Sequence, residues 1–351
     1  MSFNFVDFPA VNLDYLRCLT DTTGVVQHSK FATPNRKEGY ATDDNARALI
    51  FCAKHYDLFE SSEIAKLADV YLSFLYHMQR NDGRLHNFLG YDRRFLDEVG
   101  SDDCLGRTLW ACGHVINSGF CEEKKLVAKE IFDKAVSYSI TSSFPRAKAF
   151  AVLGLCEYHY AYPNDQNVLR IIVELVEDLV SRYKANSSVD WSWFENVVTY
   201  CNGRIPQALF EACECVDDSD FVNVALDSFN FLLKVQMKNG VFMPVGNNGW
   251  FKKGGKMAVY DQQSVEASCM SEAALVAFRV TGENDFKFLA KRIFEWYFGR
   301  NSKELLVYNP KIGGCYDGLT PKGLNLNQGA EATISYLLAR LDFEVWKDIF
   351  S

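Results

Sequence analysis

The chain has 351 residues, of which 48% are hydrophobic and 14% aromatic, so it is long and apolar enough to bury a large core. Its formal net charge of −8 argues against nucleic acid or an anionic membrane surface as the main partner and leaves an uncharged or cationic ligand. No apolar run approaches the roughly 18 residues needed to span a bilayer, and the first residues lack the pattern of a secretion signal. We therefore expect a cytoplasmic protein with no membrane partner.

The eleven cysteines indicate a reducing compartment rather than a disulfide framework. Several of them, such as Cys52, Cys112 and Cys156, fall inside helical apolar patterns, where a free cysteine behaves as a small buried hydrophobe. No cluster of histidines and cysteines has zinc-ligand spacing, and no nucleophile elbow is present. We expect neither a metal nor another cofactor.

Apolar residues at helical spacing predict about twelve helices. In chain order these segments are 10–21, 43–57, 62–80, 102–117, 122–140, 146–160, 165–184, 204–216, 220–238, 262–280, 284–299 and 327–341. The even-numbered segments are rich in Ala, Gly, Ser and Cys, as close-packed inner helices are, whereas the odd-numbered ones are amphipathic. The alternation predicts an all-α fold, an (α/α)6 toroid forming a single domain over 1–351, with short β-hairpins in the loops at the cavity end.

Two predicted inner helices begin with the same pattern. The segment 39–50 reads GYATDDNARALI, in which Thr42 is the expected N-cap and two carboxylates occupy the first turn, where the helix dipole favours negative charge. The segment 100–107, GSDDCLGR, repeats this arrangement. Each helix start therefore combines a pair of aspartates with an arginine one turn later.

A second repeat joins an outer helix to the next acidic helix start. MQRNDGRLHNF at 78–88 leads to Asp102 and Asp103, and VQMKNGVFMP at 235–244 leads to Asp261 and Gln262. Each copy contains a Gln-x-x-x-Gly turn and a short expected hairpin, at an offset near 157–159 residues. Repetition at this scale indicates stacked supersecondary units that share a core.

The long loops precede the inner helices, so they must gather at one end of the ring. They fall at 83–101, 185–203, 240–260 and 300–326, and each mixes aromatic residues with carboxylates or amides. Aromatic rings stack on the apolar faces of sugars while polar groups bind sugar hydroxyls. The loop composition therefore predicts a saccharide ligand.

Five stretches resemble a bacterial family of six-hairpin toroids. They are GYATDDNARAL, DGRLHNFLGYDRRFLDEVGSDDCLGRTLWA, WSWFENVVTYCNGRIPQAL, PVGNNGWFKKGG followed by YDQQSVEA, and GGCYDGLTPKGLNLNQGAEATISYLLA. That family occurs alone, fused to glycosyltransferases or beside genes for mannoside phosphorylases. The resemblance covers nearly the whole chain and implies the (α/α)6 fold, a carbohydrate context that favours mannose, and a glycosyltransferase or mannoside phosphorylase as functional partner.

The wider six-hairpin superfamily includes inverting glycosidases, glycoside phosphorylases, unsaturated-uronide hydrolases and epimerases, so the chemistry must come from the residues. Inverting hydrolysis needs an acid and a base about 6.5–9.5 Å apart, which neighbouring helix mouths can supply. Glu195, among aromatic and amide neighbours, is our predicted acid, and Asp103 is the predicted base. The other catalytic candidates are Asp43, Asp44, Asp102, Asp261 and Asp317. The expected substrate contacts are Arg47, Tyr91, Arg107, Trp191, Trp193, Asn196, Trp250, Tyr260, Gln262, Glu266, Tyr316, Asn325, Gln328 and Glu331.

Each of these groups also has an ordinary structural interpretation. An aspartate at a helix start is most often a cap or a first-turn charge. Arg47, Arg107, Arg146 and Arg204 lie near the starts of inner helices, where they either bind a phosphate or sugar carboxylate or simply pair with a nearby acid. An epimerase on this fold needs cavity histidines, and His86 is the one histidine that we place there.

Enzymatic and non-enzymatic functions stay open at this point. The favoured one is an inverting glycoside hydrolase acting on an oligosaccharide, and the enzymatic alternatives are a glycoside phosphorylase and a sugar epimerase. A toroid that binds a glycan without cleaving it, in support of a glycosyltransferase or phosphorylase, is the non-enzymatic alternative. A purely structural scaffold does not explain why aromatic and acidic residues concentrate in loops at one end.

Overall fold

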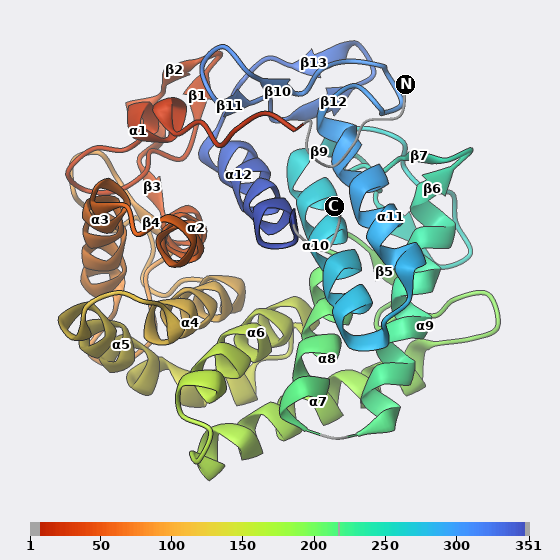
Figure 1. Cartoon of the computed structure of the whole chain (residues 1–351), viewed down its shortest axis with the longest axis horizontal. Helices are drawn as coiled ribbons and strands as arrows, with labels where there is room; N and C mark the ends of the chain where they lie inside the picture. Colours follow the sequence, from red (N-terminus) through yellow and green to blue (C-terminus); the bar gives the residue numbers. More distant parts are fainter. Residues whose placement is uncertain (1–7, 217, 348–351) are drawn as a thin grey trace.

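The structure is a computed structural model that describes residues 8–216 and 218–347. Within these ranges, twelve α-helices form two concentric rings (Figure 1). The inner helices are α2 (Thr42–Phe59), α4 (Asp102–Asn117), α6 (Pro145–Ala161), α8 (Arg204–Cys215), α10 (Ser264–Thr281) and α12 (Ala330–Val345). The outer helices are α1 (Asp14–Leu19), α3 (Ser62–Met78), α5 (Glu122–Thr141), α7 (Gln166–Asn186), α9 (Ser219–Gln236) and α11 (Asn284–Phe294). The predicted (α/α)6 toroid is confirmed.

The two ends of the chain close the ring. Helix α12 lies beside α2, to which it is joined by an ion pair between Glu331 and Arg47 (Figure 1). The short helix α1 packs outside α12, where the Tyr15 hydroxyl donates to the backbone oxygen of Gln328 at 3.0 Å. Residues more than 280 positions apart therefore form the sixth hairpin and complete the inner ring.

Burial separates the inner helices from the outer ones. Every residue of α10 from Ser264 to Ala277 is buried, whereas α7 buries a single face that includes Ile171, Leu175 and Leu179. Small residues let the inner helices approach closely: a Cβ placed on Gly113 of α4 would lie 2.2 Å from the carbonyl oxygen of Gly154 in α6. The Ala- and Gly-rich composition of the even-numbered segments thus has the packing role that the sequence predicted.

Short antiparallel ladders join the loops that precede the inner helices. The two-stranded pairs are β1 (Ser29–Lys30) with β2 (Thr33–Pro34), β3 (Tyr40–Ala41) with β4 (Phe88–Leu89), β5 (Val197–Val198) with β8 (Phe251–Lys252), β6 (Met237–Lys238) with β7 (Val241–Phe242), and β10 (Tyr308–Asn309) with β11 (Gly314–Cys315). A three-stranded sheet has the order β13 (Gly323–Asn325), β12 (Gly318–Thr320), β9 (Gln262–Gln263). Because β3–β4, β5–β8 and β9–β12 each connect two such loops, they fix the rim of the cavity end.

The repeated Gln-x-x-x-Gly turn is present in both copies. Gly83 and Gly240 have φ angles of +94° and +74°, a backbone region that glycine enters at little cost. The second copy forms the β6–β7 hairpin, and the first forms an isolated bridge between Gln79 and Leu85. The expected hairpins are therefore found after α3 and α9.

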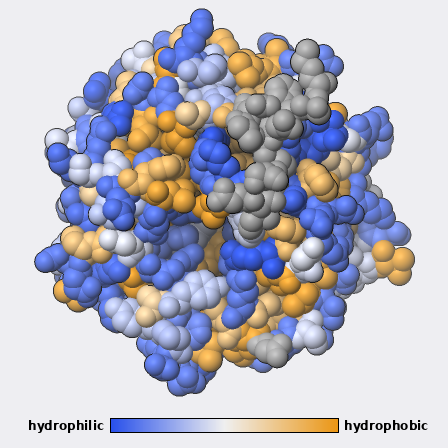
Figure 2. Space-filling view, viewed as in Figure 1, coloured by the Kyte–Doolittle hydropathy of each residue, from blue (hydrophilic) through white to orange (hydrophobic). Residues whose placement is uncertain are grey.

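All six inner helices run in the same direction. A pocket at one end of the ring is lined by residues from their C-terminal halves, which are Lys54, His114, Glu157, Glu211, Arg279 and Asp342. Their N-terminal ends, with the long loops, meet at the other end. The face shown in Figure 2 mixes hydrophilic and hydrophobic residues, and none of the described helices is long and apolar enough to cross a membrane.

Candidate functional site

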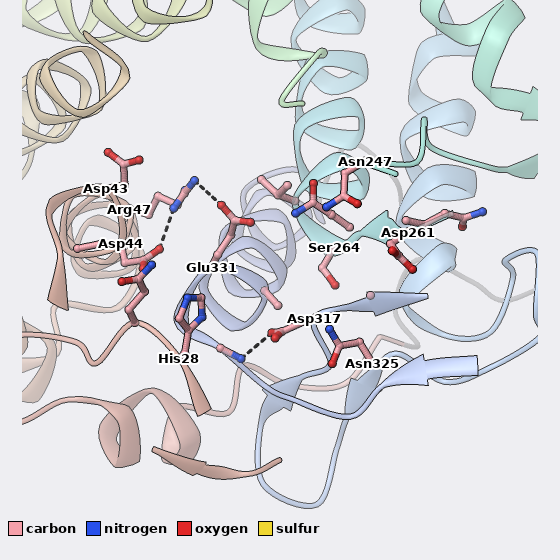
Figure 3. Close-up of a pocket in the computed structure, with 18 of the residues that line it drawn as sticks. His28, Asp43, Asp44, Arg47, Asn247, Asp261, Ser264, Asp317, Asn325 and Glu331 are labelled. Atoms are coloured by element: carbon pink, nitrogen blue, oxygen red, sulfur yellow. Dashed lines mark hydrogen bonds and ion pairs between the residues drawn. The ribbon is translucent and has the colours of Figure 1, made fainter. Parts of the chain in front are cut away.

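Two adjoining cavities occupy the end of the ring where the inner helices begin. The first, of about 360 Å³, lies among the starts of α2, α10 and α12 and contains five carboxylates, which are Asp43, Asp44, Asp261, Asp317 and Glu331 (Figure 3). The second, of about 550 Å³, is lined by Ser101, Asp102, Asp103, Arg107, Phe144 and Tyr200. Asp43, Arg47 and Glu331 line both cavities, so they form the boundary between them.

The start of α2 differs by one residue from the prediction. Ala41 occupies the N-cap position and Thr42 is the first helical residue, its hydroxyl donating to the backbone oxygen of His86 at 2.7 Å. Thr42 is thus not the N-cap, because its side chain ties α2 to the neighbouring loop instead. The first turn still carries Asp43 and Asp44, as the dipole argument predicts.

Arg47 forms ion pairs with two carboxylates at this boundary. Its guanidinium donates to Asp44 at 2.8 Å and to Glu331 at 2.7 Å, as the dashed lines in Figure 3 show. Asp44 is almost fully buried, and burial raises its pKa to about 7 against the lowering effect of Arg47. The ion pair between Arg47 and Glu331 therefore joins the start of α2 to the start of α12.

Asp43 is held less tightly. Its Oδ2 lies 3.8 Å from Nε of Arg107, and its Oδ1 has no hydrogen-bond partner among the described residues. Burial raises its pKa above the usual 3.8, and Asp103 and Glu331 add to this, while Arg107 and Arg47 lower it. Burial therefore shifts Asp43 toward its protonated form, and Oδ1 of its carboxyl group is left without a partner from the described residues.

The opposite wall of the first cavity carries Asp261 and Asp317 (Figure 3). The Asp317 carboxylate accepts from the backbone N–H of Gly329 at 2.7 Å, and burial raises its pKa although Gly329 and His28 lower it. The Asp261 side chain makes no hydrogen bond or ion pair with the part of the chain that the structure describes. Asp261 is thus available to hold a water molecule or a sugar hydroxyl.

The second aspartate pair lines the second cavity. Tyr200 donates to Asp103 at 2.8 Å, and Ser142 donates to Asp102 at 2.7 Å. Burial and then the adjacent Asp103 raise the pKa of Tyr200, which therefore stays a donor at neutral pH. Helix α4 begins at Asp102, where the Ser101 hydroxyl caps it by accepting from the N–H of Cys104.

Glu195 does not lie where the prediction needs it. Its carboxylate forms an ion pair of 2.6 Å with Arg146, and it is not among the residues lining either cavity. The aromatic neighbours that we expected to desolvate it pack into the core. Glu195 therefore helps to hold its own loop against α6, and the prediction that it is the acid is not supported by this placement.

Burial also removes three predicted substrate contacts. Trp191 and Trp193 are 3% and 0% exposed, and their indole N–H groups donate to the backbone oxygens of Glu195 and Val197. These rings have no face open to a sugar. Glu266 is 1% exposed and accepts from the backbone of Cys201 and the side chain of Asn202, so it supports the loop before α8.

The remaining predicted contacts divide between cavity and rim. Gln262 and Asn325 line the first cavity. Gln328, which is buried and accepts from Asn309 at 3.3 Å, and Tyr316 line neither cavity. Tyr91 and Asn196 are exposed, and the two half-buried residues Trp250 and Tyr260 lie in the loop before α10.

Sequence reasoning missed the histidine of the first cavity. His28 lines that cavity, whereas the ring of His86 stacks on Phe95 at 3.9 Å and its Nδ1 bonds the backbone oxygen of Asp97 at 2.8 Å. The prediction for His86 is therefore wrong. His28 lies in the loop before α2. The rule that loops before inner helices gather at one end of the ring, when it is applied to this first loop as well, identifies His28. Gln27, Asn247 and Ser264 were missed as well.

The four arginines near the starts of inner helices are mostly paired with acids. Arg47, Arg146 and Arg204 form hydrogen-bonded ion pairs with carboxylates at 2.5–2.8 Å. Arg107 lies over the ring of Phe150 at 3.9 Å and donates to the sulfur of Cys201. No group of three or more metal-ligating side chains is present among the described residues.

No family model matches the sequence, and no curated protein is significantly similar to it. Solved structures are similar in fold. A sugar epimerase from a ruminal bacterium has a TM-score of 0.74 at 12% identity over 98% of this chain and 96% of that one. The GH76 α-mannanase of Bacteroides thetaiotaomicron has a TM-score of 0.68 at 10% identity, covering 95% and 93%.

A third similar structure is an inactive variant of an α-1,6-mannanase from Salegentibacter, in complex with α-1,6-mannotriose. Two consecutive aspartates are replaced by asparagine in that variant, and its TM-score is 0.62 at 11% identity over 95% of this chain and 96% of that one. At such identities the comparison establishes the toroid fold and leaves the activity to be argued from the site.

Proposed function

We propose that the protein is a carbohydrate-active enzyme that hydrolyses a glycosidic bond of an oligosaccharide with inversion of configuration. The observation that carries this proposal is the position of Asp43, a carboxyl group with a raised pKa on the boundary between two adjoining cavities. A glycosidic oxygen joins two sugars, so an acid on such a boundary is next to the bond between them.

In this mechanism Asp43 is the general acid. It delivers its proton to the glycosidic oxygen, and burial favours the protonated form that this step requires. When the proton has left, Arg107 at 3.8 Å stabilises the carboxylate that remains. The sugar that is attacked occupies the first cavity, and the leaving group extends into the second.

Asp261 is the proposed base. It faces Asp43 across the first cavity (Figure 3), and its carboxylate is free to orient a water molecule toward the anomeric carbon. This assignment replaces Asp103, which lies beside Arg107 in the second cavity and is already bonded by Tyr200. Asp103 then belongs to the leaving-group side of the site.

Similar proteins support a carbohydrate substrate and favour mannosides. The inactive mannanase variant indicates that consecutive aspartates matter to its activity, and this chain carries two such pairs, 43–44 and 102–103, at its cavities. We propose a cytoplasmic enzyme acting on a mannoside, with a glycosyltransferase or mannoside phosphorylase as functional partner.

A sugar epimerase is the second candidate, and His28 is the observation that favours it. Epimerisation at the carbon next to the carbonyl of a sugar requires one group to remove a proton from that adjacent carbon and another to return a proton to its opposite face. His28 lies in the first cavity near Asp317, and the similar structures include sugar epimerases. His28 is the sole histidine lining that cavity in the described chain, so a carboxylate would have to supply the second group.

Product chromatography on manno- and gluco-oligosaccharides, with and without phosphate, tests the proposal. We expect shortened sugars from the wild type without phosphate, and a loss of about 10²–10⁴-fold in Asp43→Asn, the usual contribution of an acid catalyst. Glycosides with a dinitrophenolate leaving group need no protonation, so Asp43→Asn should retain most of its activity on them. Asp190→Asn, which replaces an exposed aspartate in the loop before α8, is the matched control.

Other outcomes would indicate a different function. A sugar phosphate formed only with added phosphate would establish phosphorolysis. A changed sugar of unchanged length, abolished by His28→Ala, would establish epimerisation. Saccharide binding without any turnover would make the toroid a glycan-binding partner of another enzyme.

A further inference from the structure

The second cavity contains a donor and an acceptor that the protein itself leaves without hydrogen-bond partners. The side chain of Arg107 is only 4% exposed, yet its Nε has no hydrogen-bond partner among the described residues, and the same holds for Oδ1 of Asp43. A buried polar group left unpaired destabilises the protein unless something else bonds it. Both groups belong to residues lining the same cavity, which makes a ligand the natural partner for them.

The chemistry of the two groups indicates what kind of ligand fits. A sugar hydroxyl both donates and accepts, so one hydroxyl or a neighbouring pair satisfies Arg107 and Asp43 together. With Asp43 protonated as the proposed acid, the three carboxylates Asp102, Asp103 and Glu331 line the cavity against the two cations Arg47 and Arg107. This excess of negative charge disfavours a uronide, a sugar phosphate or inorganic phosphate.

An aromatic residue stands at the edge of this cavity. Phe144 immediately precedes α6 and is 59% exposed, although it lines the cavity. The N–H of Phe144 donates to the Ser142 hydroxyl, and that hydroxyl donates to Asp102, so the backbone beside the ring is tied to the start of α4. An exposed ring fixed in this way offers a flat apolar surface on which the face of a pyranose can stack.

We infer that the second cavity is the leaving-group subsite for an uncharged sugar, held by Arg107 and Asp43 and stacked on Phe144. The inference rests on the proposed function, because it places the scissile bond at Asp43. It goes further by naming the substrate class: an uncharged oligosaccharide that spans both cavities, of which the second holds at least one sugar on the leaving-group side.

The test compares two substrates that differ on the leaving-group side. Kinetics are measured with the trisaccharide that the wild type cleaves fastest and with a dinitrophenyl glycoside of the same sugar, which places no sugar in the second cavity. Phe144→Ala should lower kcat/KM for the trisaccharide about tenfold, the loss expected from removing one stacked ring. Its turnover of the dinitrophenyl glycoside should stay within about twofold of the wild type.

Two further variants separate binding from folding. Arg107→Lys keeps the charge but not the fork of donors, and it should also weaken trisaccharide turnover more than aryl glycoside turnover. Phe288→Ala removes a similarly exposed ring from the outer helix α11 and should change the turnover of neither substrate. Equal losses on both substrates in Phe144→Ala, or no loss on either, would overturn the subsite.

The subsite can also be judged if no glycoside is cleaved. Calorimetry with α-1,6-mannose oligosaccharides should then show tighter binding of the trisaccharide than of mannose, with the difference lost in Phe144→Ala. Equal affinities for the trisaccharide and mannose, or tighter binding of a uronide or mannose 6-phosphate than of the uncharged sugar, would refute the inference. Failure of hydrolysis with preserved trisaccharide binding would refute the proposed function alone.

Discussion

Replacing Glu266 by glutamine should change how the stability of the protein depends on pH. Glu266 is 1% exposed, forms no ion pair with an arginine or lysine of the described residues, and accepts hydrogen bonds from the loop at 201–202. Burial, and after it the neighbouring Cys201, raise its pKa from 4.5 to about 8, and the hydrogen bonds only partly oppose this. The folded protein thus holds a proton on Glu266 that the unfolded chain releases near pH 4.5.

The sign and size of the effect follow from linkage. Between pH 4.5 and 8 the folded state binds one more proton at this site than the unfolded state, so the free energy of unfolding falls as pH rises. The pKa difference between 4.5 and about 8, at about 1.36 kcal/mol per pH unit, corresponds to a change of up to about 5 kcal/mol in the free energy of unfolding. Glutamine does not titrate, so Glu266→Gln removes this slope.

The assay is urea unfolding of wild type and Glu266→Gln at pH 5, 6, 7 and 8. The two proteins should differ by about 1 kcal/mol at pH 5, where both side chains are neutral, and the variant should become relatively more stable at each step upward. Parallel pH profiles would refute the reasoning. A loss of saccharide binding with an unchanged pH profile would instead restore Glu266 as a substrate contact.

Three substitutions test the other structural assignments. Arg47→Met leaves buried Asp44 unpaired and should lower the free energy of unfolding in urea by about 3–5 kcal/mol. Arg94→Met, which removes an exposed ion pair, should lower it by under about 0.5 kcal/mol. Similar losses of stability in the two variants would contradict the burial argument. Gly113→Ala forces α4 away from α6 and should lower the free energy of unfolding by about 1–3 kcal/mol or more. Gly119→Ala, whose Cβ would lie 3.4 Å from its nearest neighbour, an oxygen of the Asp57 side chain, should be nearly neutral in thermal denaturation. Trp191→Phe loses the bond to the Glu195 backbone and should cost about 1 kcal/mol without changing saccharide affinity, and a weaker affinity in calorimetry would reinstate Trp191 as a stacking surface.

The sequence by itself determined the architecture. Helical periodicity is a local property, so it predicted the order of the twelve helices, and the small residues at positions such as Gly113 and Gly154 predicted which of them pack closely. Because the inner helices run in one direction, the same pattern also placed the acidic helix starts of α2 and α4 at one end. The carbohydrate function remains a proposal that the loop composition first suggested.

Only the tertiary structure decided which polar groups are free. Arg47 pairs with Glu331, 284 positions away, where the ring closes, and Arg146 pairs with Glu195. In the same way burial turned Trp191 into a core residue and left Phe144 exposed. A sequence shows that an acid or a ring lies in a loop, but its availability depends on distances between residues far apart in the chain, and those are set when the ring closes.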